Sequence, residues 1–244
     1  MPPFELLLPI GAIAFYLLDS VLWLYGNELV FHRPGGRWGH RAGSDWLLFR
    51  RRLYLPNPLT PHRPLWRIAW SEAPGRGEPS SLASFDAKLQ QLWPIRVAVI
   101  SLLALIVIGL PLVLILTGQG LVLLGLFAAA YLLAAGAVIC LWRQRQTLGF
   151  SPGTCVALTI DALACPPFAI NLLRKIALRQ PLRGDPLDVA GPIFSAQSMQ
   201  ALCAALSRSL RTEIDAEPEL STRHRQLVDY LTALQERSEC QPAK

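Results

Sequence analysis

Charged residues are missing from the middle of this sequence. Residues 97–142, between Arg96 and Arg143, contain no Asp, Glu, Lys or Arg. A soluble helix needs a polar face toward water, so this stretch does not fit an ordinary water-exposed helix. A membrane-spanning helix needs about 20 apolar residues. The stretch therefore predicts two spans joined by a tight turn, in an integral, multi-pass protein of the inner (plasma) membrane.

Basic residues are absent from the start of the chain. The first 32 residues contain no Lys or Arg, whereas a secretory signal opens with a positively charged region. The opening hydrophobic stretch is therefore expected to stay in the mature protein as a first span, from about Leu6 to Asn27. Asp19 is the one charged residue within it.

Motifs of known chemistry are also missing. The five cysteines form no C-x-x-C pair, and none lies at zinc-ligand spacing from a histidine. No nucleophile-elbow motif or phosphate-binding loop is present. The sequence therefore predicts no catalytic, metal-binding or cofactor-binding residue and no cofactor, and it favours a chain that is not an enzyme.

The basic residues that are present indicate an orientation, because cytoplasmic flanks of membrane spans are enriched in Lys and Arg. The segment 26–92 carries ten of them, and Arg143 and Arg145 follow the third span. The glycine turn at 118–120 carries none. These positions predict that the N-terminus and the glycine turn lie outside the cell, and that the 26–92 loop and the C-terminal tail lie in the cytoplasm.

The predicted fold class is an all-α integral membrane protein with three transmembrane helices. To these are added a re-entrant or interfacial segment, a small irregular or β lobe in the loop, and an amphipathic helical hairpin in the tail. The expected parts are a first transmembrane helix at 1–27, a basic, Trp-rich cytoplasmic loop at 28–92, a transmembrane hairpin at 93–142, a re-entrant or interfacial segment with a connector at 143–191, and a cytoplasmic helical tail at 192–244.

Residues 154–173 are long and apolar enough for a fourth span, but three features count against one. Asp161 lies in the middle of the segment, where a charge costs about 2.5–3.5 kcal/mol on insertion scales. Pro166 and Pro167 remove two backbone donors, and a basic stretch follows. A re-entrant or surface-lying segment is therefore favoured over a crossing.

The cytoplasmic loop combines tryptophan with arginine. It is expected to fold as a small lobe with a tryptophan core and a basic rim. The alternative is a surface that binds anionic lipid headgroups, each basic residue contributing about 1 kcal/mol. The residues proposed for headgroup contact are Trp46, Arg50, Arg51, Arg52 and Trp66. Nucleic acid is not an expected partner, because no recognition motif accompanies the basic residues.

Asp19 and Asp161 are the candidate functional residues, because ionisable groups inside a membrane are costly and often functional. Asp19 fits an ion or proton relay, a contact with another chain, or a structural hydrogen bond or ion pair. Asp161 either approaches Asp19 to form an acidic pair or, as the simpler arrangement, pairs with Arg143 or Arg145.

Two further patterns predict packing surfaces. Small residues at Gly125, Ala129, Ala130 and Ala134 permit close helix approach, either within the hairpin or with another subunit. In the tail, apolar residues recur at helical spacing over 195–214 and 221–238. These two stripes must bury on each other, on the basic loop, on the membrane or on a partner.

Together these features favour a non-enzymatic membrane-embedded subunit that scaffolds or recruits partners at the cytoplasmic face. The expected partners are the lipid bilayer, anionic headgroups, and a protein partner or further copies of the chain. The alternative function is an oligomeric transporter or channel component that uses the intramembrane Asp19.

Overall fold

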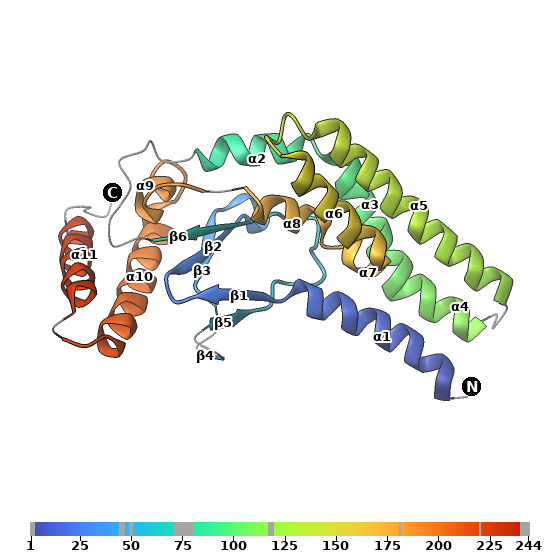
Figure 1. Ribbon diagram of the computed structural model, residues 1–244, viewed down its shortest axis with the longest axis horizontal. Helices are drawn as coiled ribbons and strands as arrows, with labels where there is room; N and C mark the ends of the chain where they lie inside the picture. The colour runs from blue at the N-terminus through green and yellow to red at the C-terminus, as the bar shows by residue number, and fades with distance from the viewer. Residues whose placement is uncertain are drawn as a thin grey trace. The chain divides into compact units, whose positions relative to one another are not determined.

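The computed structural model describes residues 3–43, 47–48, 51–70, 81–116, 120–180, 182–219 and 221–239. The chain is mostly helical with a small β portion, as Figure 1 shows. It divides into two compact units, each assembled from three separate stretches. The first, called the helical unit, comprises Met1–Val21, Leu55–Pro64 and Asp86–Arg179. The second, called the lobe unit, comprises Leu22–Tyr54, Leu65–Phe85 and Gln180–Lys244.

Almost all regular structure of the helical unit is helical. Its elements are α1 (Pro3–Ser20), α3 (Trp93–Ala104), the π-helical turn η2 (Leu105–Gly109), α4 (Leu110–Leu116), α5 (Gly120–Gln144), α6 (Pro152–Ala164), α7 (Pro166–Ala169) and α8 (Leu172–Leu178). The helix α2 (Leu82–Gln90) precedes α3 and carries the boundary between the two units. The α3–α4 helix and α5 pack along each other.

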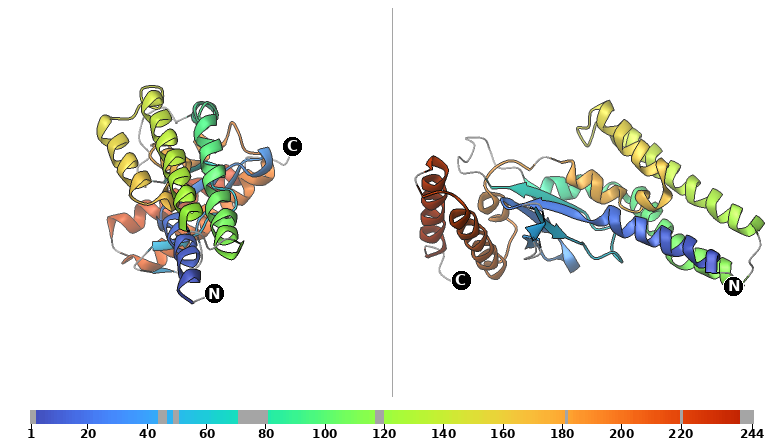
Figure 2. Two further views of the ribbon diagram at one scale, coloured as in Figure 1. Left: turned by 90° about the vertical axis from the view of Figure 1, so that its right-hand side faces the viewer. Right: turned by 60° about the horizontal axis from the view of Figure 1, so that its bottom comes forward.

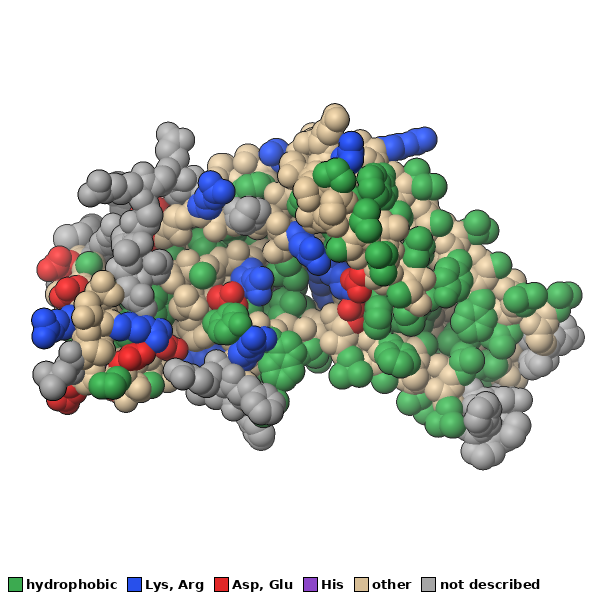
Figure 3. All heavy atoms as spheres, in the orientation of Figure 1, with side chains coloured by type: hydrophobic (Ala, Val, Ile, Leu, Met, Phe, Trp, Pro, Cys, Tyr) green, Lys and Arg blue, Asp and Glu red, His purple; other side chains and the backbone are tan. Residues whose placement is uncertain are grey.

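Two of these helices are long and apolar enough to cross a membrane: Trp93–Leu116, with 24 residues, and Gly120–Gln144, with 25. Only 22% of the most apolar window of each is buried, whereas a core helix of a soluble protein is mostly buried. Large apolar side chains such as Ile108, Leu121 and Leu132 point outward instead. Figure 3 shows hydrophobic side chains covering the helices of this unit. The two helices lie where the sequence predicted the second and third spans; most of the glycine turn lies outside the described residues.

Pro111 lies within the helix Trp93–Leu116, and the structure shows how the helix accommodates it. Proline lacks the N–H that the carbonyl of Val107 would accept, and its ring crowds that carbonyl. The preceding residues, Leu105–Gly109, adopt a π-helical turn, and the Leu110 N–H donates to the Leu105 carbonyl, five residues back. A wider turn before a proline is one of the recognised causes of a bend.

The first helix is shorter than predicted. α1 ends at Ser20, not near Asn27, and β1 (Leu22–Tyr25) follows at once. Leu24 is buried while Trp23 and Tyr25 are exposed, so the alternation of a half-buried strand overrides helix formation there. The apolar part of α1, Leu7–Ser20, is shorter than a complete span. Three spans are therefore not shown.

Among the described residues, the lobe unit contains two antiparallel three-stranded sheets, which agree with the small β lobe predicted beside the helices. One sheet has the order β1-β5-β4, with β5 (Arg51–Tyr54) and β4 (Leu47–Leu48). The other has the order β3-β2-β6, with β2 (Glu28–His32), β3 (Gly39–Arg41) and β6 (Leu65–Ala69). The 3₁₀ turn η1 (Pro34–Gly36) connects β2 to β3. Aromatic and β-branched residues in these segments favour a pleated, half-buried surface.

The tail helices complete the lobe unit. They are α9 (Pro186–Ala190), α10 (Ala196–Ala216) and α11 (Thr222–Glu239), with α10 and α11 packed together (Figure 2). The α10 stripe is buried, and Ser209 Oγ donates to the Gly26 carbonyl at 2.7 Å. Trp70 stacks on Tyr230 with ring centroids 5.9 Å apart. Of the four predicted burial partners for the tail stripes, the structure shows two: each other and the loop.

Two histidines give the lobe unit an expected pH dependence. Burial lowers the pKa of His40, and His32 and Arg41 lower it further, although a hydrogen bond with the Ala201 backbone acts in the opposite direction. Burial and Arg41 also lower the pKa of His32. Both histidines therefore take up a proton less readily in the folded lobe than in the unfolded chain, where the pKa is near 6.5.

Because the unfolded state binds more protons below that pH, the free energy of unfolding should be highest above about pH 6.5. It should fall as the pH drops toward the folded-state pKa values. Thermal midpoints of the full-length protein at pH 7.5 and 5.5 check this. The double variant His32→Gln, His40→Gln should show a smaller difference between the two pH values; an unchanged difference would assign the effect to other groups.

Candidate functional site

The two candidate acids meet at one place in the helical unit, which we call the polar cluster: Tyr16, Asp19, Ser20, Asp161, Asn171, Arg174 and Lys175. These residues come from the C-terminal end of α1, from α6 and from the start of α8. Segments more than 150 residues apart in the sequence, α1 and α8, are joined there.

Lys175 is the centre of the cluster. Its Nζ lies 2.7 Å from Asp19 Oδ1 and 2.5 Å from Asp161 Oδ2. The side chains of Lys175 and Asp19 are 18% and 14% exposed, and that of Asp161 is 40% exposed. One ammonium group therefore serves two carboxylates, and the more exposed of the two is Asp161.

Asn171 connects the ion pairs to the buried end of α1. Its Nδ2 donates to Asp19 Oδ2 at 2.9 Å and lies 2.9 Å from Ser20 Oγ. Ser20 Oγ donates to the Tyr16 carbonyl at 2.8 Å. Ser20 and Asn171 are each only 2% exposed. Buried polar groups need such partners, because an unmet donor or acceptor costs about 1–3 kcal/mol.

Arg174 ties the cluster to the segment 55–64. Its Nη2 donates to the Asn57 carbonyl at 2.6 Å and to the Thr60 carbonyl at 2.9 Å. The Tyr16 hydroxyl donates to the carbonyl of Pro58 in the same segment. Arg174 is 3% exposed, so these bonds from Nη2 to backbone oxygens lie inside the protein.

The local sequence explains how Lys175 reaches both acids. Ser151 caps α6 by accepting from the Thr154 N–H, and Pro152 occupies the first turn. Cys165 adopts an extended conformation, as expected for a residue that precedes proline, and this ends α6. The chain restarts as α7 and then as α8, which brings Lys175 back beside Asp161. Residues 154–173 thus form a helix, a break and short helices rather than one continuous span.

The arrangement is suited to holding helices together more than to chemistry. Each carboxylate already has a cation, and the amide and guanidinium groups are engaged with oxygen acceptors. Removing one member of a buried ion pair leaves an uncompensated charge and costs about 3–5 kcal/mol when burial is complete. Among the described residues, no group of three or more His, Cys, Asp or Glu is placed to hold a metal ion.

The sequence located the acids but not their partners. Asp161 pairs with Lys175, not with Arg143 or Arg145, so the simpler predicted arrangement is wrong. The guanidinium of Arg145 instead lies 5.7 Å from the centroid of the Trp142 ring. Asn171, Arg174 and Lys175 were missed as site residues. A signal in the sequence could have found them. Acids inside a membrane need a cationic or hydrogen-bonding partner, and Arg174 and Lys175 directly follow the apolar segment 154–173 that contains Asp161.

The predicted small-residue face divides into an inner and an outer part. Ala130 and Ala134 are 2% and 0% exposed on the side of α5 that packs inward. Ala129 is half-buried and Gly125 is exposed, with no atom within 4 Å of a Cβ added there. The hairpin therefore uses Ala130 and Ala134 itself. Contact with another subunit through Gly125 stays a prediction.

The residues proposed for headgroup contact also divide. Trp66 is 0% exposed in the core of the lobe unit, so its assignment to a lipid surface is wrong: the indole packs 5.0 Å from the ring of Trp38. Arg51 is exposed, and Arg52 is half-buried. Trp46 and Arg50 lie outside the described residues. Headgroup contact by Arg51 and Arg52 stays a prediction.

Comparison of the chain with models of protein families, with curated proteins and with solved structures finds no match in any of the three.

Proposed function

We propose that this chain is a multi-pass inner-membrane protein that serves as a non-enzymatic subunit, holding its lobe unit at the cytoplasmic face for a protein partner. The observation that carries the proposal is the outward direction of the apolar side chains on Trp93–Leu116 and Gly120–Gln144. α1, with 18 residues, is about 27 Å long, close to the hydrocarbon thickness of about 30 Å. In the proposed arrangement α1 is the first of three spans, and its N-terminus lies outside.

The path of the chain supports a scaffolding role. It passes between the two units at five points: 21/22, 54/55, 64/65, 85/86 and 179/180. A lobe attached to a membrane unit by a single linker can move far from the surface. Five covalent connections limit how far the lobe unit can move away from the helical unit.

The lobe unit also exposes a face suited to a partner. Three apolar side chains of the sheet β1-β5-β4 point outward: Trp23 is 39% exposed, Tyr25 is 48% exposed and Leu48 is 49% exposed. Arg51 pairs with Tyr25 across the strands, its guanidinium 4.6 Å from the ring centroid and 2.6 Å from the hydroxyl. Tyr, Trp and Arg are enriched where proteins bind one another. We call these four residues the aromatic face.

The transport alternative depends on Asp19. The contacts of its carboxylate with Lys175 and Asn171 favour a structural role, because a relay group needs an exchangeable partner along a path. A measured ion or proton flux in vesicles that Asp19→Asn abolishes would favour transport over the scaffold proposal.

The scaffold proposal is tested by purifying the full-length protein from its native membranes in a mild detergent and measuring the mass of the complex. We expect a stoichiometric partner and a protein mass above the 26.9 kDa of one chain. The double variant Trp23→Ser, Tyr25→Ser should release the partner while leaving the protein folded. Leu59→Ser, at an exposed residue of the helical unit, is the matched control and should retain it. A pure monomer from wild-type membranes would contradict the proposal.

A further inference from the structure

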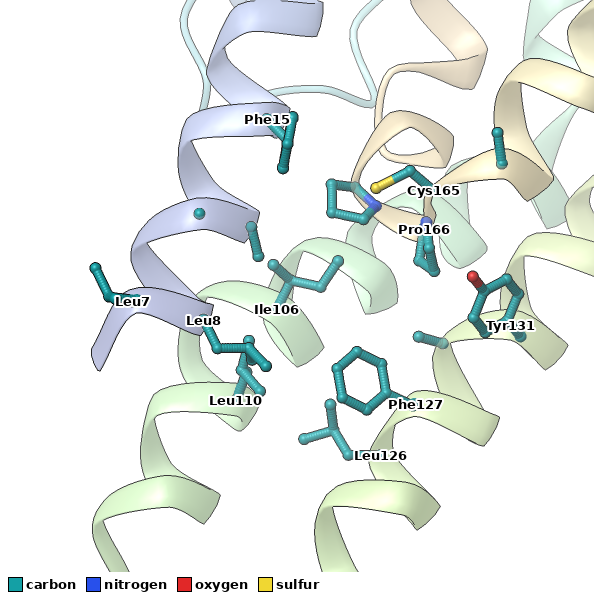
Figure 4. A pocket seen from close by; sticks show the side chains of 15 residues that line it. Leu7, Leu8, Phe15, Ile106, Leu110, Leu126, Phe127, Tyr131, Cys165 and Pro166 are labelled. Carbon is teal, nitrogen blue, oxygen red and sulfur yellow. The ribbon is translucent and has the colours of Figure 1, made fainter. Parts of the chain in front are cut away.

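The helical unit contains an apolar cavity that the proposed function does not use. Its volume is about 410 Å³, within the range of about 300–1,000 Å³ for small-molecule sites. Four parts of the unit form its walls: α1, the π-turn with α4, α5, and the corner at 164–167 where α6 ends. Figure 4 shows Leu8, Leu110 and Phe127 directed into the same space.

The cavity exists because small residues occupy wall positions. Gly11 and Ala12 of α1, Ala130 of α5 and Ala164 of α6 line it, and a Cβ built on Gly11 meets no atom within 4 Å. The two prolines after Cys165 prevent α6 from continuing through the space. Wall residues such as Leu7 and Phe15 are 59% and 54% exposed, so the space opens to the surroundings and a ligand can enter it.

The walls indicate what the occupant is. No charged residue lines the cavity, and the polar side-chain groups on its wall are the Tyr131 hydroxyl and the Cys165 thiol. Such a surface binds hydrocarbon and disfavours sugars, nucleotides and ions. A cavity of this volume holds a ligand of about drug size, which corresponds to one acyl chain and not to a polyprenyl chain several times longer.

One end of the cavity leads to the polar cluster. Asp19 lies one helical turn beyond the wall residue Phe15, and Asp161 lies one turn before Ala164 and Cys165. Phe15 packs edge-on against Phe168, with ring centroids 6.3 Å apart, and Lys175 Nζ lies 5.3 Å from the Phe168 ring centroid. The charge of the cluster most open to the surroundings is the Asp161 carboxylate, at 40% exposure. Asp161 already holds Lys175 through Oδ2, but a carboxylate that is 40% exposed can contact a headgroup ammonium in addition.

We infer that the cavity and the polar cluster together bind one phosphatidylethanolamine molecule, with an acyl chain in the cavity and the headgroup ammonium at Asp161. This inference rests on the proposed membrane placement of the helical unit. It assigns the two acids a second role beyond holding helices together: they mark the headgroup end of a lipid site.

The test uses full-length protein in vesicles of phosphatidylethanolamine and phosphatidylglycerol. A trace of phosphatidylethanolamine with a photoreactive diazirine in one acyl chain is added, and labelled residues are mapped by mass spectrometry. We expect label on Phe127 and Tyr131 to exceed label on Leu132, which is 74% exposed on α5. Gly11→Phe fills the cavity and should lower label at Phe127 and Tyr131 about tenfold, equivalent to about 1.4 kcal/mol, while label at Leu132 stays constant.

Gly136→Phe is the matched control, because Gly136 is an exposed helical glycine outside the cavity wall with equally open space around it. It should leave the labelling of Phe127 and Tyr131 unchanged. Photoreactive phosphatidylglycerol should label the cavity less than the ethanolamine lipid does, and Asp161→Asn should reduce that preference.

Equal label at Tyr131 and Leu132, or no effect of Gly11→Phe, would overturn the cavity site. Equal labelling by the two lipids would overturn the headgroup assignment. The scaffold proposal is tested separately, because a monomeric mass in detergent would contradict it whatever the lipid labelling shows. Gly11→Phe should not release the protein partner. Absence of label at Leu132 as well as in the cavity would contradict the membrane placement itself.

Discussion

Replacing Lys175 with Met is expected to cause a large loss of stability in the helical unit. The change keeps a long apolar side chain but leaves the Asp19 and Asp161 carboxylates without their shared cation. Removing one partner of a buried pair costs about 3–5 kcal/mol, and the partial exposure of Asp161 reduces this to about 3 kcal/mol. For a chain of this length the thermal midpoint should fall by about 6–12 °C, measured on the full-length protein in detergent.

Two variants separate loss of the ion pair from loss of charge in general. Arg179→Met removes an exposed cation one turn later in the same unit and should change the midpoint by less than about 4 °C, because exposed charges contribute about 0–1 kcal/mol. Adding Asp161→Asn to Lys175→Met should restore part of the loss, since one uncompensated carboxylate is then gone. Equal effects of Lys175→Met and Arg179→Met would show that the polar cluster does not stabilise the unit.

The second large effect is expected for Trp66→Ala in the lobe unit. Trp66 is 0% exposed and lies on β6, opposite Phe31 of β2. Truncation of a buried aromatic side chain to alanine costs about 3–5 kcal/mol, because it loses apolar burial and leaves a cavity. We expect the lobe unit to become sensitive to limited proteolysis at a temperature where the wild-type protein is resistant.

The matched control is Trp23→Ala, at 39% exposure on the aromatic face. It should leave protease resistance nearly unchanged, since much of its indole is already in contact with solvent. The two variants also test whether Trp66 contacts lipid. If it did, Trp66→Ala would lower the affinity of the protein for membranes and leave its folding intact, which would contradict the place of Trp66 in the core.

Much of the helical unit follows from local composition. The absence of charge over 97–142 predicts the two long helices, because a run of that length and hydrophobicity leaves no polar face. The break at Cys165 follows from the prolines after it, since the residue before a proline avoids helical geometry. The tail helices α10 and α11 follow from another local pattern, because apolar residues recur there at close to 3.6 residues per repeat.

The end of α1 was harder to predict because two patterns compete there. Residues 21–25 are apolar and continue the hydrophobic run, so composition favours a longer helix. The strand forms because Leu22 to Tyr25 pair with residues 51–54, which lie about 30 positions away in the sequence. Strand pairing of that kind depends on a partner segment, and local propensity does not encode it.

The sequence by itself determined the apolar helices, the helical break at the paired prolines and the positions of the two acids, because each depends on neighbouring residues alone. The tertiary structure decided that Lys175 lies between Asp19 and Asp161, that Trp66 is core, and that small residues on three helices leave a cavity. These features depend on side chains from distant segments meeting at distances of a few ångströms. Only the folded arrangement of the chain determines such distances.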